Sequence, residues 1–148
     1  LAAVELKRRK NLNVVTNSLS VAVELGGVPT FRVILLGGEI NAQYSFTYGE
    51  DAKGQLCQYK ADWAILSVDG ISPDTGLTTY HAEESVIDCL MMERSAKTLV
   101  VADSSKLGRE SFSRVSGLEA VTCWITDEAA DRTLTERVAS ARVEVRFA

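Results

Sequence analysis

The chain has 148 residues, of which 46% are hydrophobic and 24% are charged. This composition is that of a globular domain large enough to bury a core without disulfides. Its 20 acidic and 16 basic residues give a net charge of −4, which argues against nucleic-acid binding by this chain itself, because a phosphate backbone needs a basic surface.

The cysteines and the apolar runs indicate the cellular compartment in which the protein is expected. Cys57, Cys89 and Cys123 are widely spaced, form no Cys-x-x-Cys pair and are accompanied by a single histidine, His81. This pattern predicts reduced, mostly buried thiols in a cytoplasmic protein, and no metal site. No apolar run reaches the roughly 18 residues of a transmembrane helix, so no membrane partner is expected. The chain begins with Leu1 rather than Met, which suggests a piece of a longer protein.

Hydrophobic periodicity predicts alternating helices and strands in the first part of the chain. We expect the end of a helix at 1–9, a very short strand at 14–15, a helix at 19–25, a buried strand at 31–36 and, weakly, a helix at 50–60. Residues 39–48 are polar and aromatic, and their pattern is ambiguous.

The alternation continues to the end of the chain. We expect a strand at 63–68, a turn-rich loop at 71–79, a helix at 81–96, strands at 98–102 and 121–126, a helix at 128–140 and a strand at 143–147. Trp63, Trp124 and Phe31 fall in the apolar strand runs and are predicted to lie in the core. Short continuous apolar strands are typical of parallel sheets that are covered on both faces. The prediction is therefore an α/β fold, with a doubly wound, mostly parallel sheet and helices on both faces.

Small and polar residues follow the predicted strands, at the edge of a parallel sheet where ligands usually bind. They are Thr16-Asn17-Ser18, Gly37-Gly38, Asp69-Gly70, Asp103 to Lys106 and Thr126-Asp127. The first group opens a helix, whose free N–H groups and positive dipole end suit an anion; alternatively, Asn17 or Ser18 is only a helix cap. Similarly, Lys106 is either a phosphate-binding cation or a solvated surface residue.

The order of these motifs resembles the effector-sensing C-terminal domain of DeoR-type transcriptional regulators. The stretches that carry the resemblance are VVTNSLSVAVEL, VILLGGE, ADWAILSVDGISPDTGLTT, EES, VVADSSKLGRESF and ITD. The resemblance implies a fold similar to ribose-phosphate isomerases, a phosphorylated sugar or polyol as effector, no cofactor, and a homo-oligomeric repressor. Residues 1–148 would then be a single sensor domain, and DNA would bind only through a winged helix-turn-helix upstream of it.

Transferred to this sequence, the resemblance implies a ligand site with no catalytic residue and no metal. The implied ligand-binding residues are Thr16, Asn17, Ser18, Gly37, Gly38, Asp69, Gly70, Gly76, Leu77, Thr78, Glu83 (or its neighbour Glu84) and Lys106. The family's first strand, with a D-x-G-T-T phosphate loop, is expected upstream of this chain, so the site is expected to be incomplete. Residues 43–48 are also more aromatic and less basic than the family pattern.

Two alternatives stay open. A sugar-phosphate isomerase would need a carboxylate base, for which Asp69, Glu83 and Glu84 are candidates, with Lys106 as the electrophile. Against it, residues 71–73 (ISP) stand where a second acidic residue would be expected close after Asp69-Gly70. The other alternative is an oligomerisation module with a vestigial pocket.

Overall fold

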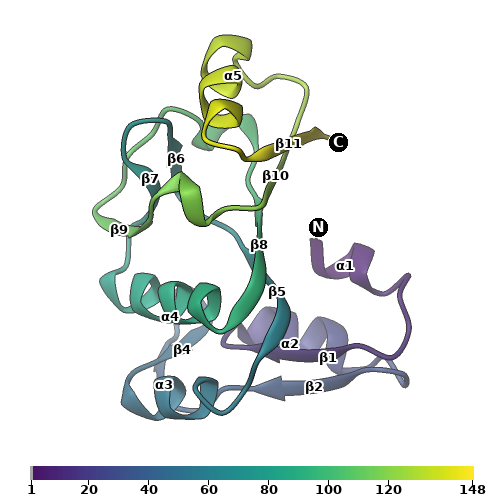
Figure 1. The fold of residues 1–148 in the computed structure, drawn as a ribbon. Helices are drawn as coiled ribbons and strands as arrows, with labels where there is room; N and C mark the ends of the chain where they lie inside the picture. Colours follow the sequence, from purple (N-terminus) through teal and green to yellow (C-terminus); the bar gives the residue numbers. More distant parts are fainter. Residues whose placement is uncertain (1) are drawn as a thin grey trace. The chain divides into compact units, whose positions relative to one another are not determined.

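The computed structural model describes residues 2–148, which divide into two compact units, Leu1–Tyr59 and Lys60–Ala148 (Figure 1). Leu1, with which the first predicted helix begins, lies outside the described residues. Both units mix helices with strands, as the alternating apolar pattern predicts.

The first unit is built on two parallel strands joined by a helix. β1 (Asn13–Thr16) pairs with β2 (Arg32–Leu35), and α2 (Leu19–Gly26) connects them. The remaining helices are α1 (Ala2–Leu6) and α3 (Glu50–Leu56). The ambiguous segment forms an antiparallel hairpin of β3 (Glu39–Asn41) and β4 (Phe46–Tyr48), and Ser45 turns the chain with a φ of 58°. The helices and parallel strands predicted here are confirmed: β1 and α2 are slightly longer than predicted, and α1, β2 and α3 are shorter.

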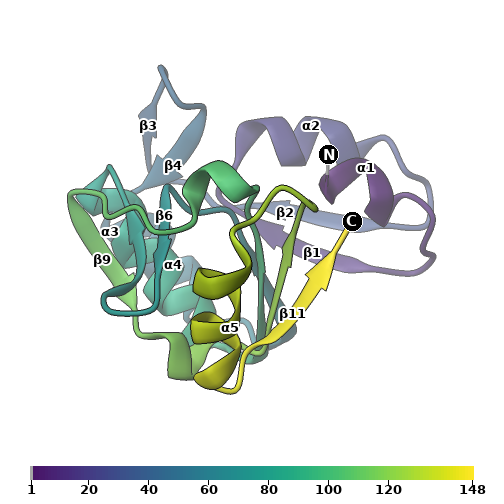
Figure 2. The same ribbon diagram turned by 90° about the horizontal axis from the view of Figure 1, so that it is seen from above.

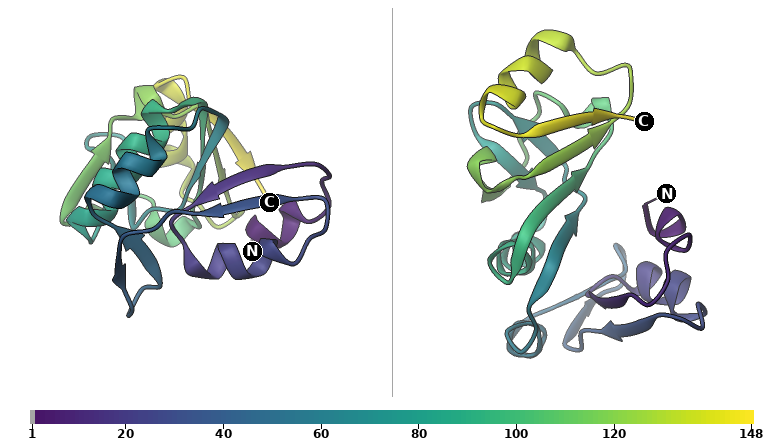
Figure 3. Two further views of the ribbon diagram at one scale, coloured as in Figure 1. Left: turned by 90° about the horizontal axis from the view of Figure 1, so that it is seen from below. Right: turned by 45° about the vertical axis from the view of Figure 1, so that its right-hand side comes forward.

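A four-stranded parallel sheet is the centre of the second unit. Its strands, in spatial order, are β11 (Glu144–Phe147), β10 (Cys123–Thr126), β8 (Ser95–Val101) and β5 (Ala61–Leu66), and they lie side by side in the right-hand view of Figure 3. The flanking helices are α4 (Ala82–Glu93) and α5 (Arg132–Ser140). Figure 2 shows α5 beside β11. This mixed architecture, with a central parallel sheet flanked by helices, confirms the predicted fold class.

The predicted loop at 71–79 is wrong, because most of it is an antiparallel hairpin. β6 (Gly70–Ser72) pairs with β7 (Gly76–Thr79), which also pairs with β9 (Ser113–Ser116). Each strand is too short for its alternation to stand out from the turn residues between them. Two short 3₁₀ helices, η1 (Ser104–Lys106) and η2 (Leu118–Ala120), complete the unit.

The apolar core of the second unit packs around Trp124, which is fully buried. Its indole Nε1–H donates to the Ala102 carbonyl at 3.0 Å, so the polar atom of this ring is satisfied. Trp63 was predicted in the core but is 45% exposed, because it lies on the edge strand β5 and faces away from that core. Phe31 is only half-buried.

The three cysteines are free thiols in three different environments. Cys57 is exposed, Cys89 is half-buried and Cys123 is buried. The expectation of mostly buried thiols is therefore wrong for Cys57, which ends the short helix α3 at the surface.

Candidate functional site

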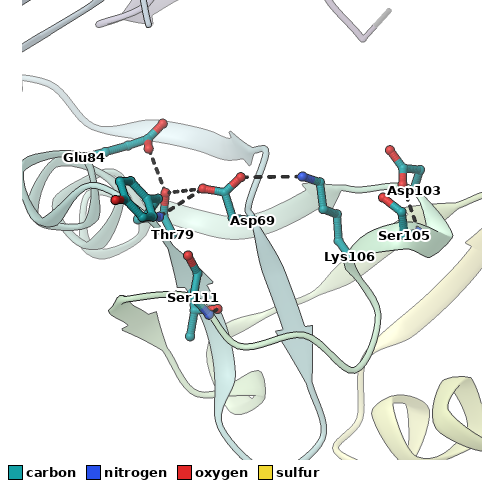
Figure 4. A network of polar contacts seen from close by, with 9 residues as sticks. Asp69, Thr79, Glu84, Asp103, Ser105, Lys106 and Ser111 are labelled. Carbon is teal, nitrogen blue, oxygen red and sulfur yellow. Dashed lines mark hydrogen bonds and ion pairs between the residues drawn. The ribbon is translucent and has the colours of Figure 1, made fainter.

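A polar cluster lies where β5 ends and α4 begins (Figure 4). Asp69, three residues beyond the end of β5, accepts hydrogen bonds at Oδ2 from the Tyr80 backbone N–H (3.0 Å) and from the Thr79 hydroxyl (3.1 Å). The Thr79 hydroxyl also lies 2.7 Å from Glu84 Oε2. Two carboxylates from separate elements therefore meet at one hydroxyl group. We call Asp69, Thr79, Glu84 and Lys106 the carboxylate cluster.

The Thr79 hydroxyl cannot donate a hydrogen bond to both carboxylates at once. It carries one proton, and its side chain is 99% buried, so its position is fixed by packing. Because the distance to Glu84 is the shorter one, the Thr79 hydroxyl donates its hydrogen bond to Glu84. Asp69 still accepts a hydrogen bond from the Tyr80 N–H. The cluster is thus rich in acceptor oxygens and poor in donors, which is the arrangement that binds hydroxyl groups of a ligand.

Lys106 supplies the cation of the cluster. Its Nζ lies 3.5 Å from Asp69 Oδ1, and its side chain is 31% exposed. An ion pair of this length between partly exposed groups contributes at most about 1 kcal/mol. A phosphate can therefore compete with Asp69 for the ammonium group.

Two capping carboxylates hold the segment that carries Lys106. Asp103 Oδ1 accepts the Ser105 N–H at 2.9 Å, and Asp127 Oδ2 accepts the Ser104 N–H at 2.7 Å. Hydrogen bonds from Ser105 lower the pKa of Asp103, and those from Ser104 lower the pKa of Asp127. Both carboxylates therefore stay ionised at neutral pH and fix the turn before Lys106.

A third carboxylate, Asp88, lies one helical turn beyond Glu84 on α4. It is 94% buried, and its Oδ2 has no hydrogen-bond partner among the described residues. Burial, and then the negative charges of Glu84 and Asp69, raise its pKa to about 8. Asp88 is therefore mostly protonated at neutral pH, and the cluster avoids a third negative charge.

The other predicted residues of this unit are part of the β6–β7 hairpin. A Cβ on Gly70 would collide with the Arg109 carbonyl and the Thr78 hydroxyl, and Gly76 has a φ of 84° and lies against the Ser116 carbonyl. Leu77 is fully buried in the core and Thr78 is 4% exposed. These residues pack the hairpin whose last residue, Thr79, belongs to the carboxylate cluster.

In the first unit, the predicted residues Thr16, Asn17 and Ser18 connect β1 to α2. Ser18 is the N-cap of α2: its Oγ accepts the Val21 N–H at 3.3 Å. The Ser18 N–H donates a hydrogen bond to Thr16 Oγ1. The Leu19 N–H donates one to the Ser45 carbonyl. Local partners thus already occupy most of the N–H groups that would attract an anion, and of the two capping candidates Ser18 is the one that caps.

Local contacts also hold Asn17 and the two predicted glycines of the first unit. Asn17 Nδ2 donates to the Thr47 carbonyl at 3.1 Å. The Gly37 N–H donates to Gln55 Oε1 at 2.9 Å, and Gly38 has a φ of 129° with no room for a Cβ beside the Tyr48 carbonyl.

The predicted site residues fall into two sets, one in each unit of the chain. In the second unit Asp69 lies beside Lys106 and shares the Thr79 hydroxyl with Glu84, the alternative to Glu83; Thr79 itself is an addition. Glu83 is exposed on the first turn of α4, whereas its neighbour Glu84 is half-buried and contacts Thr79. Thr79 was missed as a site residue, although it ends the GLTT motif, because a single threonine in a strand carries no signal of its own.

Residues 2–148 hold neither a metal-binding group of side chains nor a membrane-spanning helix. No group of three or more His, Cys, Asp or Glu side chains is placed to hold a metal ion. Within the same residues, no helix is both long and apolar enough to cross a membrane.

Several known proteins are similar to this chain over most of its length. The chain is 35% identical to the HTH-type transcriptional regulator GlpR of Haloferax volcanii over 88% of its residues, and 30% identical to the HTH-type transcriptional repressor GlcR of Bacillus subtilis over 89%. It is 32% identical to the glycerol-3-phosphate regulon repressor of Escherichia coli over 82%. The chain spans about half the length of these relatives: 51%, 51% and 48%.

A family model gives the same assignment. The DeoR C terminal sensor domain matches residues 1–128, which include both units' predicted site residues. The match confirms the resemblance found in the motifs, and the chain belongs to the family of DeoR C-terminal sensor domains.

Proposed function

We propose that this chain is the effector-binding part of a transcriptional repressor, and that the carboxylate cluster binds a phosphorylated sugar or polyol. The observation that carries the proposal is the Thr79 hydroxyl between Asp69 and Glu84, at 3.1 and 2.7 Å. Carboxylate oxygens there accept hydrogen bonds from ligand hydroxyls, and Lys106 pairs with the phosphate.

The names of the relatives support this proposal. They include transcriptional repressors, and one is named for a glycerol-3-phosphate regulon. In a longer form, effector binding would favour one conformation or assembly over another, and this difference in affinity would change operator binding by a separate DNA-binding domain. We propose a cytoplasmic homo-oligomer for that form. The roles of Thr16, Asn17, Ser18, Gly37 and Gly38 at the effector stay predictions.

The test is a titration of the chain with ribose 5-phosphate, glucose 6-phosphate and glycerol 3-phosphate, each beside its unphosphorylated parent. A ligand present at 100 times its Kd stabilises the native state by about 2.7 kcal/mol, which a thermal-shift assay detects. We expect one phosphorylated compound to raise the Tm and Lys106→Met to weaken its binding at least tenfold. Lys60→Met, which removes an exposed lysine from the start of the second unit, is the matched control.

Three results would count against the proposal. One is that no compound binds at millimolar concentration, either to this chain or to a longer form carrying the expected first strand. Another is equal weakening by Lys60→Met. The third is hydrogen isotope exchange from a labelled aldose phosphate, abolished by Glu84→Gln, which would identify the cluster as an isomerase site instead.

A further inference from the structure

Asp88 is a buried carboxyl group beside the carboxylate cluster, and the proposed binding of an effector does not use it. It lies one helical turn beyond Glu84 on α4, is 94% buried, and its Oδ2 has no hydrogen-bond partner among the described residues. Ionising a buried carboxyl oxygen that no donor stabilises is costly. Asp88 therefore holds its proton near neutral pH, and its ionisation responds to any charge placed nearby.

The charges that act on Asp88 belong to the carboxylate cluster. Burial, and then the negative charges of Glu84 and Asp69, raise its pKa to about 8. Thr79 lies between these two carboxylates, and Lys106 lies at the far end of the cluster, beside Asp69 (Figure 4). The group that would titrate and the groups that would hold the ligand are thus electrostatically coupled.

Other ionisable residues around α4 offset these charges little. The strands packed against the helix carry three, which are Asp62 on β5, Lys97 on β8 and Arg114 on β9, and β7 carries none. The helix and its N-cap add His81, Glu83, Cys89 and Glu93. The five acidic and basic residues among these are exposed, so solvent and salt screen their charges. Burial, followed by the charges of Asp88 and Glu93, raises the pKa of Cys89, so its thiol stays neutral near pH 7.

A phosphate at Lys106 brings more negative charge to the same place, because a phosphate monoester is close to a dianion above pH 7. We propose that effector binding at the carboxylate cluster is linked to proton uptake by Asp88. The protonated form binds a phosphorylated ligand more tightly, since an ionised Asp88 repels the phosphate. By reciprocity, the bound ligand favours the protonated form. Asp88 is thus a positioning residue, which acts through the charge of the cluster. This inference rests on the proposed function.

The test is calorimetric titration of the 148-residue chain with ribose 5-phosphate, glucose 6-phosphate and glycerol 3-phosphate at pH 7 and pH 9. We expect the Kd of the compound that binds to rise at least threefold between these pH values. Asp88→Asn, which is neutral and nearly the same size, should remove the rise. Asp62→Asn is the matched control, because it removes an exposed carboxylate, and it should keep the rise.

A second measurement needs no variant. At pH 8.3, titrations in Tris and in HEPPS, two buffers with different ionisation enthalpies, should show uptake of roughly a third of a proton per ligand bound. Circular dichroism checks that each variant folds. If a compound binds with the same Kd at both pH values and without proton uptake, the inference is overturned while the proposed function stands. An equal rise in Asp88→Asn also overturns it. If no compound binds, the proposed function fails, and this inference fails with it.

Discussion

Asp88 illustrates how a single buried residue sets the charge of the candidate site. Its carboxyl is 94% buried beside Glu84 and Asp69, and its pKa is raised from 3.8 to about 8. A carboxylic acid that is protonated in the folded state and ionised in the unfolded state destabilises the fold as pH rises. The loss of stability from Asp88 therefore begins near pH 4 and is complete above about pH 8.

Asp88→Asn should remove this pH dependence, because the amide is neutral and nearly the same size. We expect the variant to be more stable than the parent, with a gain that increases between pH 4 and pH 8 by up to roughly 1.4 kcal/mol per pH unit. Urea unfolding at several pH values measures it. Asp62→Asn, which changes an exposed carboxylate near the start of β5, is the control. Parallel stability curves for Asp88→Asn and the parent would contradict this account.

Glycine residues in the two units tolerate a methyl group differently. At Gly70 an added Cβ would collide with the Arg109 carbonyl and the Thr78 hydroxyl, whereas at Gly54, inside α3, it meets nothing within 4 Å. We expect Gly70→Ala to destabilise the chain by about 1–3 kcal/mol through overpacking. Gly54→Ala should stabilise it by up to about 1 kcal/mol through helix propensity. Chemical denaturation compares the two, and equal effects would show that the hairpin can relax.

At the scale of secondary-structure elements, the edge strand β5 leaves large apolar side chains exposed. It is the edge strand of an all-parallel sheet, and Trp63 and Ile65 on it are 45% and 40% exposed. Parallel strands are normally buried on both sides. We propose that the upstream strand implied by the family resemblance, with its D-x-G-T-T loop, pairs with this edge.

This pairing would change the surroundings of Trp63. In a longer form that includes the upstream strand, we expect Trp63 fluorescence to shift to the blue and acrylamide quenching to fall at least twofold relative to this chain. Trp124 is fully buried here and serves as the internal reference, read separately in a Trp63→Phe variant. Unchanged quenching of Trp63 would argue that the edge of β5 stays open.

At the scale of the whole molecule, the apolar core around Trp124 belongs to the second unit alone. Its buried members run from Val68 to Val143, and none comes from residues 1–59. The four-stranded sheet, the β6–β7–β9 sheet and both flanking helices also lie within this unit. The second unit therefore has its own core, which is what an independently folding domain requires.

Lys60–Ala148 expressed alone should keep a cooperative thermal transition, because its core loses no member. Circular dichroism and NMR dispersion measure this, and Val100→Ala, which creates a cavity in the same core, should lower the Tm of the fragment and of the full chain alike. A fragment with no cooperative transition would mean that the first unit is needed for folding.

The amino-acid sequence by itself determined the alternating α/β pattern, the family and the strand ends at which Asp69 and Lys106 lie. These follow from apolar runs and turn residues, which act over a few neighbouring positions. The tertiary structure decided that Glu84 rather than Glu83 joins Thr79, that residues 70–79 form a hairpin, and that Trp63 is exposed. Adjacent residues on a helix point about 100° apart, and strand pairing and edge position depend on distant segments. Local periodicity carries neither kind of information, because both are set by packing between elements far apart in the chain.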